Sequence, residues 1–124
     1  MKNFYEETIE DIKRVGRTLE DIAWIGSYSV EIPINQFFKV AKATTYDNGW
    51  GRAEMPIDLR IVFKDGGYLE RREYDGSEWW QYIAPMRRPS LKARLVIKAF
   101  TDPVNSSLGD PVLSDFIYKG ANYD

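Results

Sequence analysis

Cysteine and histidine are both absent from this sequence of 124 residues. The absence of cysteine excludes a disulfide framework, a thiolate zinc site and a cysteine nucleophile. The absence of histidine removes the usual general base and the commonest metal ligand. Together these absences exclude Ser-His-Asp and Cys-His arrangements and argue against zinc enzymology, so we expect a protein that is not an enzyme and uses no cofactor.

Long apolar runs are also missing. No segment approaches the roughly 18 consecutive apolar residues of a membrane span, and the start, Met1-Lys2-Asn3, lacks the apolar h-region of a signal peptide. We therefore expect no membrane association and a cytoplasmic location. A content of 44% hydrophobic and 29% charged residues suits a single domain over residues 1–124.

The net charge of −2 is unevenly distributed along the chain. Residues 32–101 carry an excess of basic side chains, whereas the segments before and after them carry an excess of acidic ones. A nucleic-acid mimic would be strongly acidic throughout, and a dedicated DNA-binding domain would be basic overall. The charge pattern indicates neither class.

Two helices are predicted in the N-terminal part of the chain. Residues 3–15 have helical spacing of apolar side chains, with Glu6, Glu7, Glu10 and Asp11 on a solvated face and Gly16 as the end. Thr18 is expected to cap one further turn, followed by an extended segment at residues 22–25 and a half-buried strand at residues 28–32. Pro33 suits the first turn of a second helix that runs to about Thr44.

The sheet is predicted to centre on residues 57–84. Alternating apolar side chains predict a strand at residues 57–63, and Asp75-Gly76 is a strong hairpin signal between strands at residues 68–74 and 78–84. Residues 91–99 predict a further strand, and residues 112–118 an edge strand or a short helix. We therefore expect an α+β fold in which two N-terminal helices pack on a mainly antiparallel meander sheet of about four to five strands.

Adjacent tryptophans end this meander. Because successive side chains of a strand point to opposite faces, Trp79 and Trp80 must face opposite sides of the sheet. At least one of them therefore leaves the main core, unless a helix covers that side of the sheet too.

Cations and aromatic side chains gather on the predicted sheet and the loop that follows it. Surfaces that track phosphates interleave cations with stacking aromatics, and Trp, Tyr and Arg also dominate protein-binding hot spots. A third interpretation is a solvated sheet face whose cations pair with Glu70, Glu73 and Glu78. The candidate partner-binding residues are Arg71, Arg72, Trp79, Trp80, Tyr82, Arg87, Arg88, Lys92, Arg94 and Lys98.

Signatures of metal and phosphate sites are weak or missing. Asp47-Asn48-Gly49 lacks the remaining oxygen ligands of a calcium loop, and no phosphate-cradling glycine motif is present. Exposed tryptophans are suited to stacking on sugar rings, and two carboxylates could serve a glycosidase, but the sequence singles out no pair of acids.

The segment around the hairpin resembles a group of small proteins encoded by phages and mobile elements of Gram-positive bacteria. The likeness covers about Thr18 to Pro85, and its most specific piece is the run from Glu73 to Trp80, Glu-Tyr-Asp-Gly-Ser-Glu-Trp-Trp. Where that group carries Trp-Trp-Leu-Glu-Arg-His, this chain has Gly-Tyr-Leu-Glu-Arg-Arg at residues 67–72, so any role of that histidine does not carry over. The resemblance implies a mobile-element origin, where small binding proteins that block host defence, including anti-CRISPR proteins, are common.

Three functional hypotheses follow. The first is a non-enzymatic inhibitor that docks on a protein of bacterial host defence, such as a Cas nuclease or its guide complex, in the host cytoplasm. The second is a single-stranded nucleic-acid-binding protein that uses the same basic and aromatic face. The third is a carbohydrate-binding or carboxylate-based hydrolase domain, and dimerisation through an open sheet edge is a further alternative.

Overall fold

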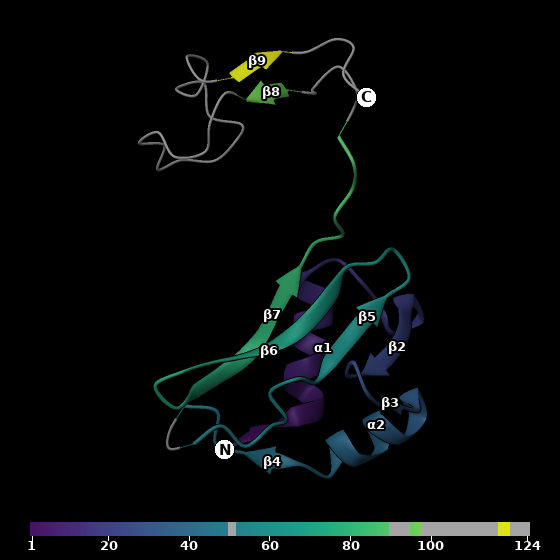
Figure 1. Cartoon of the computed structure of the whole chain (residues 1–124). Coiled ribbons are helices and arrows are strands. Elements are labelled where there is room, and N and C mark those ends of the chain that lie inside the picture. The colour runs from purple at the N-terminus through teal and green to yellow at the C-terminus, as the bar shows by residue number, and fades with distance from the viewer. Residues whose placement is uncertain (50–51, 90–94, 98–116, 120–124) are drawn as a thin grey trace. The chain divides into compact units, whose positions relative to one another are not determined.

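The chain divides into two compact units, Met1–Met86 and Arg87–Asp124. The computed structural model describes residues 1–49, 52–89, 95–97 and 117–119 (Figure 1). The single domain over residues 1–124 stays a prediction.

The N-terminal unit holds two helices and a mainly antiparallel sheet, as predicted. Its elements in chain order are β1 (Lys2–Asn3), α1 (Phe4–Arg14), the 3₁₀ turn η1 (Leu19–Asp21), β2 (Ile22–Gly26), β3 (Glu31–Ile32), α2 (Ile34–Lys42), β4 (Thr45–Tyr46), β5 (Arg60–Phe63), β6 (Tyr68–Tyr74) and β7 (Ser77–Ile83). The main sheet has the strand order β3-β2-β5-β6-β7, and β1 pairs separately with β4. The α+β class and the N-terminal helices are thereby confirmed.

Helix α1 begins at a side-chain cap and ends at a glycine. The Asn3 side-chain oxygen accepts the backbone N–H of Glu6 at 3.0 Å, which satisfies one of the free donors of the first turn. Gly16, with φ of 76°, then takes the left-handed conformation that ends the helix. The predicted solvated face is wrong in part, because Glu7 and Asp11 are buried.

Helix α2 follows Pro33 and buries Phe37, Phe38 and Ala41, as the spacing predicts. The predicted strand at residues 28–32 is reduced to β3, and Tyr28 is 92% exposed. The Ser27 hydroxyl oxygen accepts the N–H groups of Ser29 and Val30 at 3.2 and 3.3 Å, so a tight turn replaces the first half of that strand.

The meander β5-β6-β7 is the centre of the main sheet, as predicted. At the β6–β7 turn, Asp75 and Gly76 have φ of 51° and 87°, the positive values that a tight Asp-Gly hairpin requires. The predicted start of the first strand is wrong: β5 begins at Arg60, and Ile57 is 79% exposed because the preceding residues turn, with Leu59 donating to the Pro56 carbonyl at 3.3 Å.

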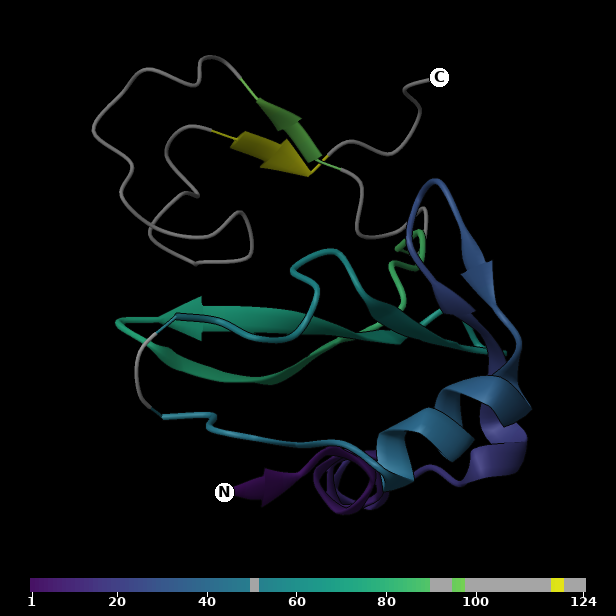
Figure 2. The same ribbon diagram turned by 90° about the horizontal axis from the view of Figure 1, so that it is seen from below.

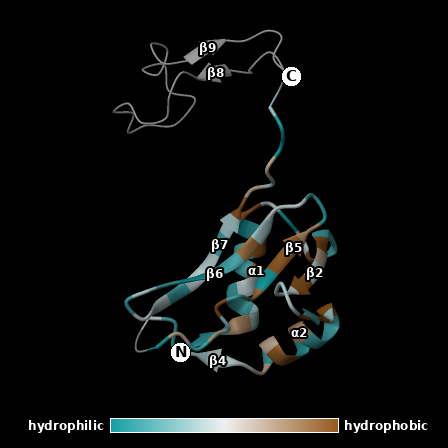
Figure 3. Cartoon of the chain, in the orientation of Figure 1, coloured by the Kyte–Doolittle hydropathy of each residue, from teal (hydrophilic) through white to brown (hydrophobic). Residues whose placement is uncertain are grey.

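Both helices cover the same face of the main sheet (Figure 2). Hydrophobic residues follow β2, β5 and α2 (Figure 3), and the buried core joins Ile25, Ile61 and Leu69 of the sheet to Phe4 and Phe37 of the helices. Within the described N-terminal unit, no helix lies on the opposite face of the sheet (Figure 2).

The C-terminal unit contains a described pair of strands, β8 (Leu95–Ile97) and β9 (Ile117–Lys119), which pair antiparallel. They confirm strand structure within the segments predicted at residues 91–99 and 112–118. The rest of both segments lies outside the described residues.

Candidate protein-binding surface

Arg71 lies in the interior instead of on the predicted binding face. Its side chain ion-pairs with Glu7 at 3.4 Å and Glu78 at 3.1 Å, and it donates to the Tyr46 hydroxyl at 3.0 Å. All four residues are buried. The prediction that Arg71 contacts a partner is therefore corrected: two carboxylates from α1 and β7 neutralise the guanidinium and hold it under the sheet.

Glu78 is held by the backbone as well as by Arg71. Its carboxylate accepts the N–H of Glu54 at 2.6 Å and the N–H of Met55 at 3.2 Å. Glu7 in turn accepts the hydroxyl of Tyr46. We call Glu7, Tyr46, Arg71 and Glu78 the interior ion cluster, and its contacts join α1, β4, β6 and β7.

Trp80 is also interior, although it too was predicted to bind a partner. It is 4% exposed, its ring stacks on Phe4 at 5.7 Å, and its indole N–H donates to the Thr8 hydroxyl at 3.0 Å. Tyr82 lies two residues further on the same side of β7 and packs partly on the core. The two residues face inward because they alternate with Trp79, which is 38% exposed.

The environment of Tyr46 makes the stability of the fold sensitive to high pH. Burial, and then the hydrogen bond to Glu7, raise the pKa of Tyr46 above its ordinary value of 10.0. Because the unfolded chain ionises first, this contribution to stability is complete below pH 10 and is lost as the pH rises toward the higher pKa of the folded state.

We therefore expect the unfolding free energy of the natural chain to fall more steeply above pH 10 than that of Tyr46→Phe. The difference in slope reaches about 1.4 kcal/mol per pH unit for one proton. Urea unfolding at steps between about pH 8 and pH 11.5 measures it. Below pH 9 the two curves should run parallel, and parallel curves over the whole range would contradict the assigned role of Tyr46.

The helix-free side of the main sheet carries aromatic and aliphatic side chains. Trp24, Val62, Tyr68 and Ile83 face one another across β2, β5, β6 and β7 in register, and Arg72 is opposite Trp79 on the outer two strands. Their chain neighbours Ile25, Ile61 and Leu69 point into the core. We call this side the open face and define it by Trp24, Val62, Tyr68, Ile83, Arg72 and Trp79.

Charges on the open face are few and mixed. Arg72 ion-pairs with Glu70 at 3.2 Å, and Arg60 lies beside Glu70 in the next strand with Tyr28 stacked over its guanidinium at 4.6 Å. The Arg72–Glu70 pair fits the prediction that cations of the sheet pair with neighbouring glutamates. In the N-terminal unit the open face therefore consists mainly of apolar and aromatic side chains, with only a slight excess of positive charge.

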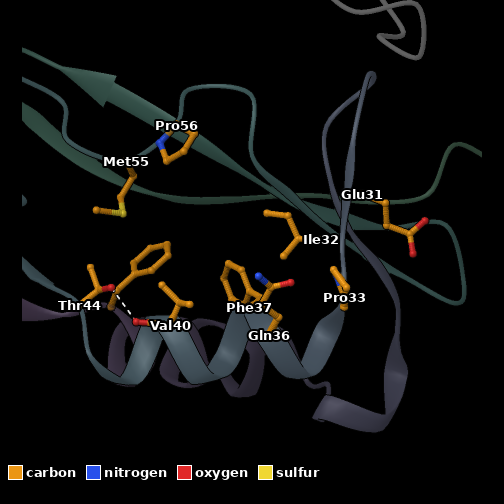
Figure 4. Close-up of a pocket in the computed structure, with 11 residues that line it drawn as sticks. Glu31, Ile32, Pro33, Gln36, Phe37, Val40, Thr44, Met55 and Pro56 are labelled. Carbon is orange, nitrogen blue, oxygen red and sulfur yellow. Dashed lines mark hydrogen bonds between the residues drawn. The ribbon is translucent and has the colours of Figure 1, made fainter.

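A groove along α2 is a second apolar surface (Figure 4). Its volume is about 460 Å³, and Val40 on its helical wall is 57% exposed. Met55 and Pro56 form the other wall, and Glu31 is the charged residue among those that line it. Sequence reasoning missed this groove because Met55 and Pro56 belong to a segment without periodicity, whose position depends on its backbone bonds to Glu78.

The predicted basic residues of the C-terminal unit are only partly described. Arg87 and Arg88 are exposed, whereas Lys92, Arg94 and Lys98 lie outside the described residues. A joint basic surface of these residues with Arg72 and Trp79 stays a prediction.

Within the described part of the chain, no group of three or more acidic side chains is arranged as a metal site. Neither of its α-helices has the length and apolarity needed to cross a membrane.

Comparison of the chain with protein-family models, curated proteins and solved structures finds no match. The surfaces of the chain itself must therefore carry a functional assignment. The open face brings Trp, Tyr and Arg side chains, the residue types predicted to bind a partner, to a side of the sheet that no helix of the N-terminal unit covers.

Proposed function

We propose that the chain is a non-enzymatic binding protein that docks on another protein through the open face. The observation that carries this proposal is the row Trp24, Val62, Tyr68 and Ile83, which no helix of the N-terminal unit covers. Aromatic and arginine side chains supply most of the energy of protein interfaces, and contiguous apolar surface marks binding sites. Trp79 and Arg72 lie on the same face, four residues along β7 and β6 from Ile83 and Tyr68, and extend this surface.

The partner that we propose is a protein of bacterial host defence, such as a Cas nuclease or its guide complex, in the cytoplasm of the host. The support is the resemblance of the segment from Thr18 to Pro85 to small proteins of phages and mobile elements. Docking that blocks such a nuclease needs only a complementary surface, and it places no demand on catalytic groups.

Nucleic-acid binding is less well supported by the described residues. The cations are Arg72, on the open face, and Arg60 next to it. Glu70 is opposite Arg60 in the neighbouring strand and forms an ion pair with Arg72. A surface that tracks a phosphate backbone needs more uncompensated positive charge than this.

Carboxylate-based hydrolysis has a candidate pair in Glu7 and Glu78, which approach each other across Arg71. Both are buried, and their carboxylate oxygens already contact Arg71, the Tyr46 hydroxyl or backbone N–H groups. An acid and base for a sugar must reach the scissile bond from two sides. This pair is occupied by structural contacts, and binding is the better supported function.

Expression of the full chain in bacteria that carry an active Cas nuclease is expected to raise the survival of a targeted phage or plasmid. The double variant Trp79→Ala with Arg72→Ala should lose this protection, and its affinity for the captured nuclease should fall by at least about tenfold because it removes two anchors of the interface. Plating efficiency and binding to the purified nuclease measure the two effects.

Matched changes on another surface provide the control. Val40→Ala and Lys39→Ala on α2 remove an exposed apolar side chain and an exposed cation, as the double variant does on the open face. They should leave protection intact. Binding that persists after nuclease digestion of nucleic acid supports docking on protein, whereas binding that disappears with digestion favours the nucleic-acid alternative. Survival that the full chain does not change in any tested defence system would reject the proposed partner class.

A further inference from the structure

Strand β7 is one of the two outer strands of the main sheet, and within the described N-terminal unit no strand pairs with its outer edge (Figure 1). The strand runs over seven residues, and no register shift interrupts its pairing with β6. Natural proteins protect an edge of this kind with lysine, proline, a bulge or a covering segment. The N-terminal half of β7 has such a cover, whereas no residue that the structure describes covers the C-terminal half.

The cover is the loop before residue 50. Glu78 donates its N–H to the Asn48 carbonyl at 2.7 Å, and Gly49 forms a single bridge with Ser77. This closes the edge at Ser77 and Glu78. Residues 79–83 continue beyond the loop, and Pro85 lies against Gly66 and Gly67, toward the β5–β6 turn and away from the outer edge.

The direction of the backbone groups follows from the same hydrogen bond. Glu78 points its N–H away from β6, and N–H groups on one side of a strand recur every second residue. Trp80 and Tyr82 therefore point their N–H and C=O groups outward as well. Among the described residues, their outward groups have one contact, a long bond of 3.5 Å from the Gln81 amide to the Tyr82 carbonyl.

The side chains along the open stretch carry nothing that repels another strand. Residues 79–83 read Trp-Trp-Gln-Tyr-Ile, without charge, proline or glycine. β-branched and aromatic residues of this kind favour pairing. An uncharged edge whose backbone groups are largely unpaired among the described residues is a template for a further antiparallel strand.

We propose that β7 pairs with β7 of a second copy of this chain, in an antiparallel dimer whose two-fold axis passes beside Gln81. In this register Trp80 and Tyr82 of one copy exchange backbone hydrogen bonds with Tyr82 and Trp80 of the other. Trp79 then lies opposite Ile83 of the second copy, and Gln81 opposite its own counterpart. This register uses the whole open stretch, and a shift toward Glu78 would collide with the loop that already holds that residue.

The dimer has a consequence for the open face. The two-fold axis between antiparallel strands is perpendicular to the sheet. It therefore leaves the helices of both copies on one side of the joined sheet and both open faces on the other. The two rows of aromatic side chains then become one surface, with the Trp79 and Gln81 side chains of both copies at its centre. This inference does not depend on which partner the open face binds.

The mass of the full chain in solution tests the dimer. Sedimentation velocity over a range of concentrations is expected to give twice the 14.4 kDa of one chain. Gln81→Lys places two like charges on the axis and should raise the dissociation constant by at least about tenfold. An equal mixture of Gln81→Lys and Gln81→Glu should restore association, because opposite charges then face each other. Gln36→Lys adds the same charge on α2 and should leave the mass unchanged.

A thiol at the axis tests the register. The natural chain has no cysteine, so Gln81→Cys carries a single thiol. Opposite residues of a non-hydrogen-bonded antiparallel pair lie about 4.5 Å apart at Cα, within the range that a disulfide spans. Mild oxidation should therefore link Gln81→Cys into a covalent dimer, while Gln36→Cys stays largely monomeric. A monomer at every concentration overturns the proposal, and so does a dimer that neither Gln81→Lys weakens nor Gln81→Cys links.

Discussion

Arg71→Met is expected to destabilise the N-terminal unit by about 3–5 kcal/mol, because it leaves two carboxylates buried without their cation. Glu7 and Glu78 both ion-pair with this guanidinium, whose side chain is only 3% exposed. Methionine fills much of the same volume, so the loss comes chiefly from the unpaired charges. Urea unfolding followed by tryptophan fluorescence measures the change.

The neighbouring arginine is the matched control for this substitution. Arg72 points to the other side of β6, its side chain is 51% exposed, and its ion pair with Glu70 lies at the surface. Arg72→Met should therefore change stability by less than about 1 kcal/mol. Adding Glu7→Gln and Glu78→Gln to Arg71→Met should recover part of the lost stability. Equal losses from the two arginine variants would contradict the assigned interior role.

Trp80→Ala should cost about 3–5 kcal/mol, the range for removing a large aromatic side chain from a core. The change opens a cavity beside Phe4, removes the hydrogen bond to Thr8 and takes away the ring beneath the Arg71 guanidinium, which lies 4.8 Å from the ring centre. Thermal unfolding by circular dichroism should show a shift of several degrees or more.

Trp79→Ala is the matched control, since it removes the same side chain from the opposite face of the same strand. We expect its thermal stability to stay near that of the natural chain while its affinity for the proposed partner falls. Trp80 and Arg71 are cross-strand neighbours, so their combined loss should be smaller than the sum of the single losses. A binding defect in Trp80→Ala at temperatures where the variant is fully folded would argue that the surface assignment is wrong.

The local pattern of the sequence predicts much of this fold. The alternation along residues 68–83 and the Asp-Gly turn fix the β6–β7 hairpin, and the spacing of Phe37, Phe38 and Ala41 fixes α2. The same alternation requires Trp79 and Trp80 to separate, as they do. These features depend on residues close in sequence, which is why one sequence is enough to find them.

The direction of each face could not be predicted in the same way. Cations and aromatics on β6 and β7 looked like one surface, yet Arg71 and Trp80 are interior because Glu7 and Thr8 of α1 meet them on the helix-covered face of the sheet. The partners of an interior arginine are tertiary contacts, and its sequence neighbours do not reveal them. The open face was missed in part for a related reason: Trp24 joins Tyr68 only through the register of β2 on β5 and of β5 on β6.

The contacts of the interior ion cluster also bear on the order of folding. The hairpins of the meander close over short loops, whereas the bond from Arg71 to Glu7 spans 64 residues and the bond from Trp80 to Thr8 spans 72. Because the entropy of closing a long loop must be overcome before such contacts form, we expect the meander to form before α1 docks. The hairpin alone can bring Arg71 to Glu78, so we expect the Glu7 ion pair to be the last contact of the cluster to form.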